Sequence, residues 1–143
     1  RSGDRGKVFL QTYQPEHPII KNVINNDYDK MYNNQLIERK DYNYPPFVRL
    51  IRITLKDKSY EKLNSSSDWI NKVIRANFEG IVLGPVYPEI SRIKNKYHKE
   101  FLVKLRDLNE INNFRSVFQS VIKSFDSISK YRSVRITVDV DPI

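Results

Sequence analysis

From Phe47 onward, the sequence predicts an α+β fold whose elements follow the order strand, helix, strand, strand, helix, strand. Alternation of apolar and polar residues indicates half-buried strands at 51–56 and 134–140. Two apolar runs around a polar segment, within 81–105, indicate a β-hairpin. The clearest helical stripe is formed by Ile111, Phe114, Phe118, Val121, Ile122 and Phe125. This order is the ferredoxin-like βαββαβ arrangement, so we expect a mostly antiparallel sheet with both helices on one face.

Helix-capping residues support both predicted helices. Ser59 can cap a helix that runs to about Asn77, and Asp107 or Asn109 can cap the second helix. The inward face of the first helix is expected to carry Leu63, Ile70, Val73 and Ile74. In this topology we expect the first and last strands to lie beside the third, in the middle of the sheet.

The residues before Phe47 predict a short strand followed by two helices. Val8 to Tyr13 has a strand-like composition, and Pro18 can serve as a first helical residue. Asn25-Asn26 ends that helix, and Asp27 is placed to cap the next one. Pro45-Pro46 then forces an extended chain.

Composition indicates a globular domain with an anionic partner. The chain has 143 residues, enough for one domain, and a formal net charge of +8. That charge favours nucleic acid or an anionic membrane surface. No apolar run approaches the roughly 18 residues of a membrane-spanning helix. The absence of cysteine excludes disulfides, thiolate zinc sites and cysteine nucleophiles, and it fits a cytoplasmic protein.

The predicted hairpin is the best candidate binding element. Its polar segment carries the cations Arg92, Lys94, Lys96 and Lys99 around one aromatic residue, Tyr97. Such a segment suits a nucleic-acid backbone, although a solvated basic loop is the simpler alternative. The open face of the predicted sheet would add Arg52, Thr54, Lys56, Lys104, Arg135 and Thr137. Open sheets often bind nucleic acids, but the exposed aromatic residues usual on them are missing here.

The residue pattern favours neither a catalytic site nor a metal site. There is no glycine-rich phosphate-binding loop. His17 and His98 lie in different segments without a carboxylate at ligand spacing, so surface or packing roles are expected for both. Asp139 and Asp141 are expected to bond to the backbone at the end of a strand. We therefore predict no catalysis by this segment alone.

Five short strings, taken in order, carry a resemblance to one family. They are residues 11–18 (QTYQPEHP), 38–40 (ERK), 44–47 (YPPF), 83–86 (LGPV) and 138–143 (VDVDPI). In this order and at these separations, the chain resembles the C-terminal end of the bacterial primosomal protein N′ family, the PriA replication-restart helicases. The resemblance covers essentially the whole chain.

The resemblance implies a parent protein that is an ATP-dependent 3′→5′ DNA helicase of superfamily 2. Such a protein would use ATP, magnesium and zinc and would reload the replication machinery at stalled forks. Its partners would be DNA forks and single-stranded/duplex junctions, single-stranded DNA-binding protein and other primosome proteins, with no membrane partner. The nucleotide- and zinc-binding motifs of the family have no counterpart in this chain, so we expect no cofactor in the fragment.

The resemblance also implies a division of the chain. Residues 1–14 would be the end of the second helicase lobe, residues 15–46 a connecting helical segment, and residues 47–143 a DNA-binding C-terminal domain. Arg1 would match the last arginine of the final helicase motif, which senses the ATP γ-phosphate.

On this interpretation, the DNA-binding residues are Arg92, Lys94, Lys96, Tyr97, Lys99, Arg52, Lys104 and Arg135. Replacing Lys94, Lys96 or Lys99 should each lower the salt dependence of DNA binding by about one ion. One alternative is a protein-interaction module that docks the helicase lobes or takes the acidic tail of single-stranded DNA-binding protein. The other alternative is a free-standing regulatory domain that binds a small molecule.

Overall fold

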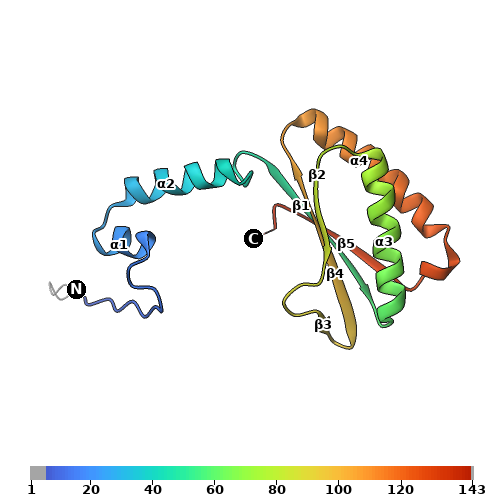
Figure 1. Ribbon diagram of the computed structural model, residues 1–143, viewed down its shortest axis with the longest axis horizontal. Helices are drawn as coiled ribbons and strands as arrows, with labels where there is room; N and C mark the ends of the chain where they lie inside the picture. Colours follow the sequence, from blue (N-terminus) through green and yellow to red (C-terminus); the bar gives the residue numbers. More distant parts are fainter. Residues whose placement is uncertain (1–5, 143) are drawn as a thin grey trace. The chain divides into compact units, whose positions relative to one another are not determined.

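The computed structural model (Figure 1) describes residues 6–142 of the chain and divides it into two compact units. The first unit reaches Glu38, and the second begins at Arg39. Arg1, the predicted nucleotide-sensing arginine, lies outside the described residues. The assignment of residues 1–14 to a helicase lobe stays a prediction.

The predicted helices before Phe47 are confirmed. Helix α1 spans Pro18–Ile24 and α2 spans Tyr28–Asp41. The Asp27 carboxylate accepts a hydrogen bond from the Lys30 N–H at 3.2 Å, which satisfies a donor that the helix itself leaves unpaired.

The predicted strand at Val8–Tyr13 is wrong. The chain from residue 6 to 12 is neither helix nor strand, and Val8 and Phe9 are 87% and 89% exposed. A strand needs a neighbouring strand to satisfy its backbone groups, and none of the described strands pairs with this segment. The apolar composition of this segment was therefore not sufficient to predict a strand.

The second unit has the predicted α+β fold. Its strands are β1 (Arg49–Asp57), β2 (Ile81–Val86), β3 (Arg92–Ile93), β4 (Lys96–Leu105) and β5 (Arg135–Val140). Its helices are α3 (Tyr60–Asn77), α4 (Leu108–Asp126) and a short 3₁₀ helix, η1 (Ser129–Tyr131). The sheet is antiparallel, with the order β2-β4-β1-β5, and β3 pairs with β4.

The position of the last strand differs from the expectation. β5 pairs with β1 at the edge of the sheet and does not lie beside β4. The reason is that the two sides of β4 are taken by β1 and β2. The remaining free side of β1 accepts β5.

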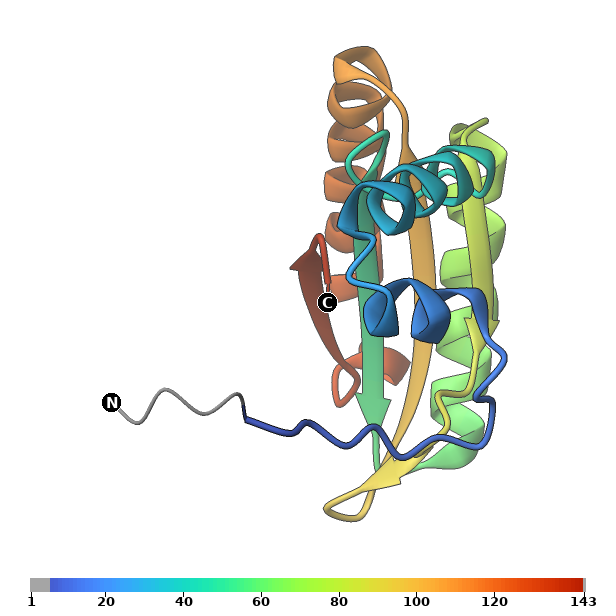
Figure 2. The same cartoon turned by 90° about the vertical axis from the view of Figure 1, so that its left-hand side faces the viewer.

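Both long helices cover the same face of the sheet (Figures 1 and 2), as predicted. The Ser59 hydroxyl caps α3 by accepting the Lys62 N–H at 3.3 Å, and the Asp107 carboxylate caps α4 by accepting the Glu110 N–H at 2.8 Å. The centre of the core between helices and sheet is formed by Ile53, Leu55, Leu63, Ile70, Ile74, Phe101, Val103, Phe114, Val121 and Phe125. The other face of the sheet is free of these helices, and we call it the open face.

The hairpin turn is shorter than the sequence suggested. β4 already begins at Lys96, so the turn consists of Lys94 and Asn95, whose φ angles are 48° and 61°. Two left-handed residues are typical of the tight turns whose twist matches paired strands. Because β1 ends opposite Tyr97, the β3–β4 hairpin extends beyond the end of β1 (Figure 2).

Candidate nucleic-acid interface

The register of the sheet decides which side chains reach the open face. Ile53 and Leu55 are fully buried under the helices, so the intervening Thr54 and Lys56 point the other way. Extending this alternation along the paired strands places on the open face Arg52, Thr54, Lys56, Lys96, His98, Glu100, Lys104, Arg135, Thr137 and Asp139. The predicted open-face residues are thus assigned correctly.

A row of basic side chains crosses three strands of this face. Lys56 on β1 lies directly opposite His98 on β4 and directly opposite Arg135 on β5. Lys96 comes two residues before His98 and shares its face. We call Lys56, Lys96, His98 and Arg135 the cationic row. Side chains directly opposite each other in antiparallel strands are about 5 Å apart at Cβ, where like charges repel.

The positive charge of the row affects the pKa of His98. Burial lowers the pKa of the His98 imidazole, and the neighbouring Lys56 and Lys96 ammonium groups lower it further, against an opposing effect of Glu100. Within residues 6–142, no carboxylate forms an ion pair with Lys56, Lys96 or Arg135. His98 is therefore uncharged at neutral pH, and the positive charge of the row comes from Lys56, Lys96 and Arg135, which have no internal counter-ion in the described part of the chain.

Arg52, which the sequence singled out, lies on the open face but is already compensated. Its guanidinium is 3.8 Å from the Glu100 carboxylate, and Asp139 is its partner across the β1–β5 pair. Two carboxylates around one cation leave little positive potential at this position.

Lys104 also lies on the open face but is 7% exposed. Its ammonium donates a hydrogen bond to the Tyr42 carbonyl at 2.7 Å and lies 4.0 Å from the centre of the Tyr44 ring. Burial lowers its pKa. The structure therefore uses Lys104 to hold the segment before β1 against the sheet.

The expected position of Lys99 on an exposed tip is wrong. Since β4 begins at Lys96, strand alternation places Lys99 with Tyr97 and Phe101 on the helix side. Its side chain is 10% exposed, and its ammonium donates to the Ser67 hydroxyl at 3.1 Å and lies 4.0 Å from the Asp68 carboxylate. It faces α3 and not solvent.

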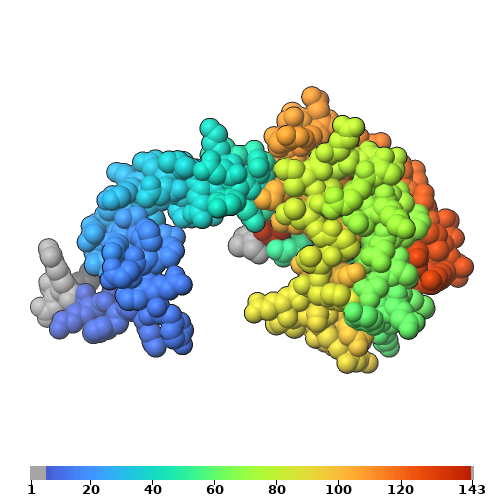
Figure 3. All heavy atoms as spheres, in the orientation of Figure 1, coloured from blue at the N-terminus to red at the C-terminus, as the bar shows by residue number. Residues whose placement is uncertain are grey.

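The other hairpin residues lie where a ligand can reach them. Arg92, Lys94 and Lys96 are exposed. The Arg92 guanidinium lies 5.0 Å from the centre of the half-buried Tyr97 ring and donates to the Asn95 amide oxygen. In the space-filling view (Figure 3), this hairpin protrudes from the second unit. The structure thus brings Arg92, Lys94 and Lys96 to one end of the sheet with Arg135.

Sequence reasoning missed two members of the cationic row as candidate contacts. Lys56 was placed on the open face but not chosen, and His98 was expected only at the surface or in packing. The alternation of β1 gave a signal for Lys56. The position of His98 opposite Lys56 depends on the register in which β1 and β4 pair, and the local residue pattern does not specify that register.

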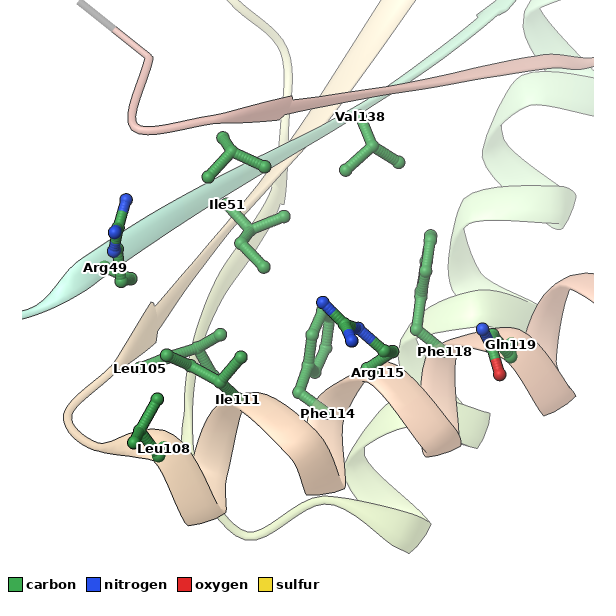
Figure 4. A pocket seen from close by; sticks show the side chains of 11 residues that line it. Arg49, Ile51, Leu105, Leu108, Ile111, Phe114, Arg115, Phe118, Gln119 and Val138 are labelled. Atoms are coloured by element: carbon green, nitrogen blue, oxygen red, sulfur yellow. The ribbon is translucent and has the colours of Figure 1, made fainter.

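A separate apolar pocket lies on the helix side, between α4 and the strands β1 and β5 (Figure 4), and we call it the α4–β5 pocket. Its volume is about 440 Å³. The pocket lining includes Ile51, Ile111, Phe118 and Val138, together with Arg49 and Arg115. An open apolar pocket beside guanidinium groups suits a peptide better than a polar metabolite.

Residues 6–142 contain neither a metal-binding cluster nor a membrane-spanning helix. No group of three or more histidine, cysteine, aspartate or glutamate residues could hold a metal ion there. In the same range, every helix is too short or too polar to span a bilayer.

Comparison with known proteins agrees with the resemblance. A family model described as the primosomal protein N C-terminal domain matches residues 40–143. Three similar proteins, each named replication restart protein PriA, come from Chlamydia muridarum, Bacillus subtilis and Thermotoga maritima. They are 29%, 24% and 32% identical over 96%, 96% and 76% of this chain.

These alignments cover only a small part of each relative. The chain spans 18%, 17% and 14% of the lengths of the three relatives, respectively. The family model, however, covers most of the chain, including all five strands and both long helices of the second unit. The chain belongs to the primosomal protein N C-terminal domain family.

Proposed function

We propose that this chain is the nucleic-acid-binding C-terminal domain of a replication restart protein. Family membership and the names of the relatives support the role in replication restart. The observation that carries nucleic-acid binding is the cationic row, which lacks an internal counter-ion and continues into the hairpin. Phosphate groups are the anions that such a row suits best.

In this proposal the contacts are to phosphates and come from the cationic row together with Arg92 and Lys94. A phosphate placed between opposing basic side chains offsets their mutual repulsion and releases counter-ions from the nucleic acid. Arg52, Lys99 and Lys104 are left out because their charged groups are compensated or covered. Recognition of this kind depends on charge and does not read the base sequence.

For the full-length protein, we extend the proposal to what the resemblance implied. It would be an ATP-dependent 3′→5′ DNA helicase using ATP, magnesium and zinc. Forked DNA, single-stranded DNA-binding protein and other primosome proteins would be its partners. The contribution of this chain would be to hold the DNA by its phosphates.

The salt dependence of binding tests the proposed contacts. The double variant Lys56→Ala/Lys96→Ala should bind a single-stranded oligonucleotide more weakly, with a slope of log K against log salt that is smaller by about 1.4. Fluorescence anisotropy between low and moderate salt would measure both quantities. The matched control is Lys72→Ala/Lys123→Ala, which removes the same charge from exposed positions on α3 and α4.

The control decides between a site and net charge. If both double variants weaken binding equally, overall charge and not the cationic row attracts the oligonucleotide. If the unmodified chain does not bind at all, the proposed function is wrong.

A second candidate function has its own supporting observation. The α4–β5 pocket combines apolar walls with Arg115, and β5 is an edge strand with a free side. A short peptide that is acidic and ends in apolar residues could place its apolar side chains in the pocket and its carboxylates near Arg115. The acidic tail of single-stranded DNA-binding protein, a partner that the resemblance implied, would be the peptide to test first.

A further inference from the structure

Three tyrosine rings from different elements meet beside the hairpin. Tyr60 is the first residue of α3, Tyr87 directly follows β2, and Tyr97 lies on β4. The rings of Tyr60 and Tyr87 are parallel within 2°, with centroids 5.7 Å apart. Tyr97 meets Tyr60 edge to face at 5.5 Å. We call these residues the tyrosine cluster.

The cluster is open to solvent, unlike the aromatic residues of the core. Tyr60 is 51% exposed and Tyr87 is 37% exposed, whereas Phe114 and Phe125 are 2% and 3% exposed. Packing alone gives little reason to leave two stacked rings at the surface, since their burial would be favourable. Part of each of these two rings therefore remains accessible to a ligand.

Polar contacts hold the Tyr87 ring, on which Tyr60 stacks, in place. The Tyr87 hydroxyl donates to the Asn64 amide oxygen at 2.6 Å, and the Lys99 ammonium lies 5.2 Å from the centre of the Tyr87 ring. Burial raises the pKa of Tyr87 to about 12. A ring fixed in this way loses little conformational freedom when a ligand binds.

The cluster is continuous with the basic hairpin. Tyr97 contacts Tyr60 on one side, and the Arg92 guanidinium lies over the Tyr97 ring. Lys94 and Lys96 follow within the same hairpin. Aromatic rings next to cations that can hold phosphates are the combination found in sites for single-stranded nucleic acid.

We infer that the tyrosine cluster is a stacking site for an unpaired nucleobase, with Tyr60 as the principal contact. The inference rests on the proposed function and adds a preference to it, namely for single strands over duplex. A base inside a duplex has both faces stacked on its neighbours, whereas an unpaired base can stack on Tyr60 while Arg92 and Lys94 hold the adjacent phosphates. The aromatic residues missing from the open face would thus be supplied on the helix side, at the end of the sheet that carries the hairpin.

The test compares Tyr60→Ala with Tyr60→Phe in the whole chain. Binding of a single-stranded oligonucleotide and of a duplex with the same number of phosphates is measured by fluorescence anisotropy. Tyr60→Ala should weaken single-strand binding about tenfold and leave duplex binding unchanged, because stacking on one base is lost. Tyr60→Phe keeps the ring and should bind like the unmodified chain. Tyr28→Ala, which removes a 64% exposed tyrosine from α2, is the matched control.

The outcomes separate this inference from the proposed function. If Tyr60→Ala binds single strands normally while Lys56→Ala/Lys96→Ala weakens binding, the stacking site is wrong and the phosphate contacts stand. Equal losses for single strand and duplex, or a loss in Tyr60→Phe as large as in Tyr60→Ala, would also overturn it. Thermal unfolding of each variant identifies a loss that comes from misfolding. If Tyr60→Ala misfolds, Tyr60→Leu, which keeps an apolar side chain but no ring, takes its place with the same expected outcomes.

Discussion

Lys99 illustrates how a single residue with the right charge can have a structural role. Its ammonium lies between the Ser67 hydroxyl and the Tyr87 ring, and its aliphatic stem is covered. The Lys99 ammonium therefore contacts α3 and the residue after β2 and does not face solvent. Lys94, two residues outside β4, has the same charge and is exposed at the turn.

We predict opposite phenotypes for these two lysines. Lys99→Ala should lower the free energy of unfolding by about 1 kcal/mol, because it removes a hydrogen bond and buried methylene groups. It should leave the salt dependence of nucleic-acid binding unchanged. Lys94→Ala should reduce the salt dependence by about one ion and leave stability unchanged. Urea unfolding and anisotropy titrations measure the two effects, and a salt effect of Lys99→Ala would contradict the assignment.

At the scale of elements, Asp141 fastens the end of β5 to β1. Its carboxylate accepts the Leu50 N–H at 3.0 Å and pairs with the Arg49 guanidinium, and its own N–H donates to the Leu50 carbonyl at 2.7 Å. The hydrogen bond from Leu50 is the main cause of the lowered pKa of this carboxyl, and the Arg49 side chain lowers it further against an opposing effect of burial. The expected backbone role of Asp141 is confirmed.

The lowered pKa makes this contribution depend on pH. A carboxyl whose pKa is lower in the folded state adds stability above its unfolded pKa, about 3.8, and loses it as the pH falls through the folded value. Asp141→Asn should therefore lower the free energy of unfolding by about 1 kcal/mol at pH 7 and by less at pH 3. Urea unfolding at both pH values tests this, with exposed Asp139→Asn as the control. An equal deficit at both pH values would assign the effect to packing instead of charge.

At the scale of the whole second unit, the two candidate surfaces lie on opposite faces of the sheet. The cationic row is on the open face, while the α4–β5 pocket is on the helix side. A ligand on one surface does not occupy the other. The interaction module and the DNA-binding domain, which the sequence left as alternatives, can therefore coexist in one fold.

This separation predicts independent binding. An acidic peptide with an apolar C-terminus should bind without displacing a labelled oligonucleotide at moderate salt, where long-range repulsion between the two ligands is screened. Arg115→Ala should weaken peptide binding and spare the oligonucleotide, and Lys56→Ala/Lys96→Ala should do the reverse. Complete mutual displacement would mean that both ligands share one site.

The sequence by itself was sufficient for the long helices and strands of the second unit and for the residues of the open face, but not for the predicted strand at Val8–Tyr13 or for the length of the hairpin turn. Period-two alternation identified β1 and β5, helical spacing and the caps Ser59 and Asp107 located α3 and α4, and both signals are contained in neighbouring residues. The order of these elements was enough to predict the ferredoxin-like α+β class. The resemblance to the family, carried by five short strings, also needed no structure.

Only the tertiary structure decided which cations are free. Lys104 is covered by Tyr44 and by Tyr42, whose carbonyl it binds and which lies 62 residues earlier in the chain. Lys99 binds the hydroxyl of Ser67, which lies 32 residues earlier. Contacts between distant parts of the chain also determine the edge position of β5, the pairing of His98 with Lys56 and the stacking of Tyr60 on Tyr87. The physical reason is that alternation assigns a side chain to one face of its own strand, whereas exposure and charge compensation depend on what the rest of the chain places against that face.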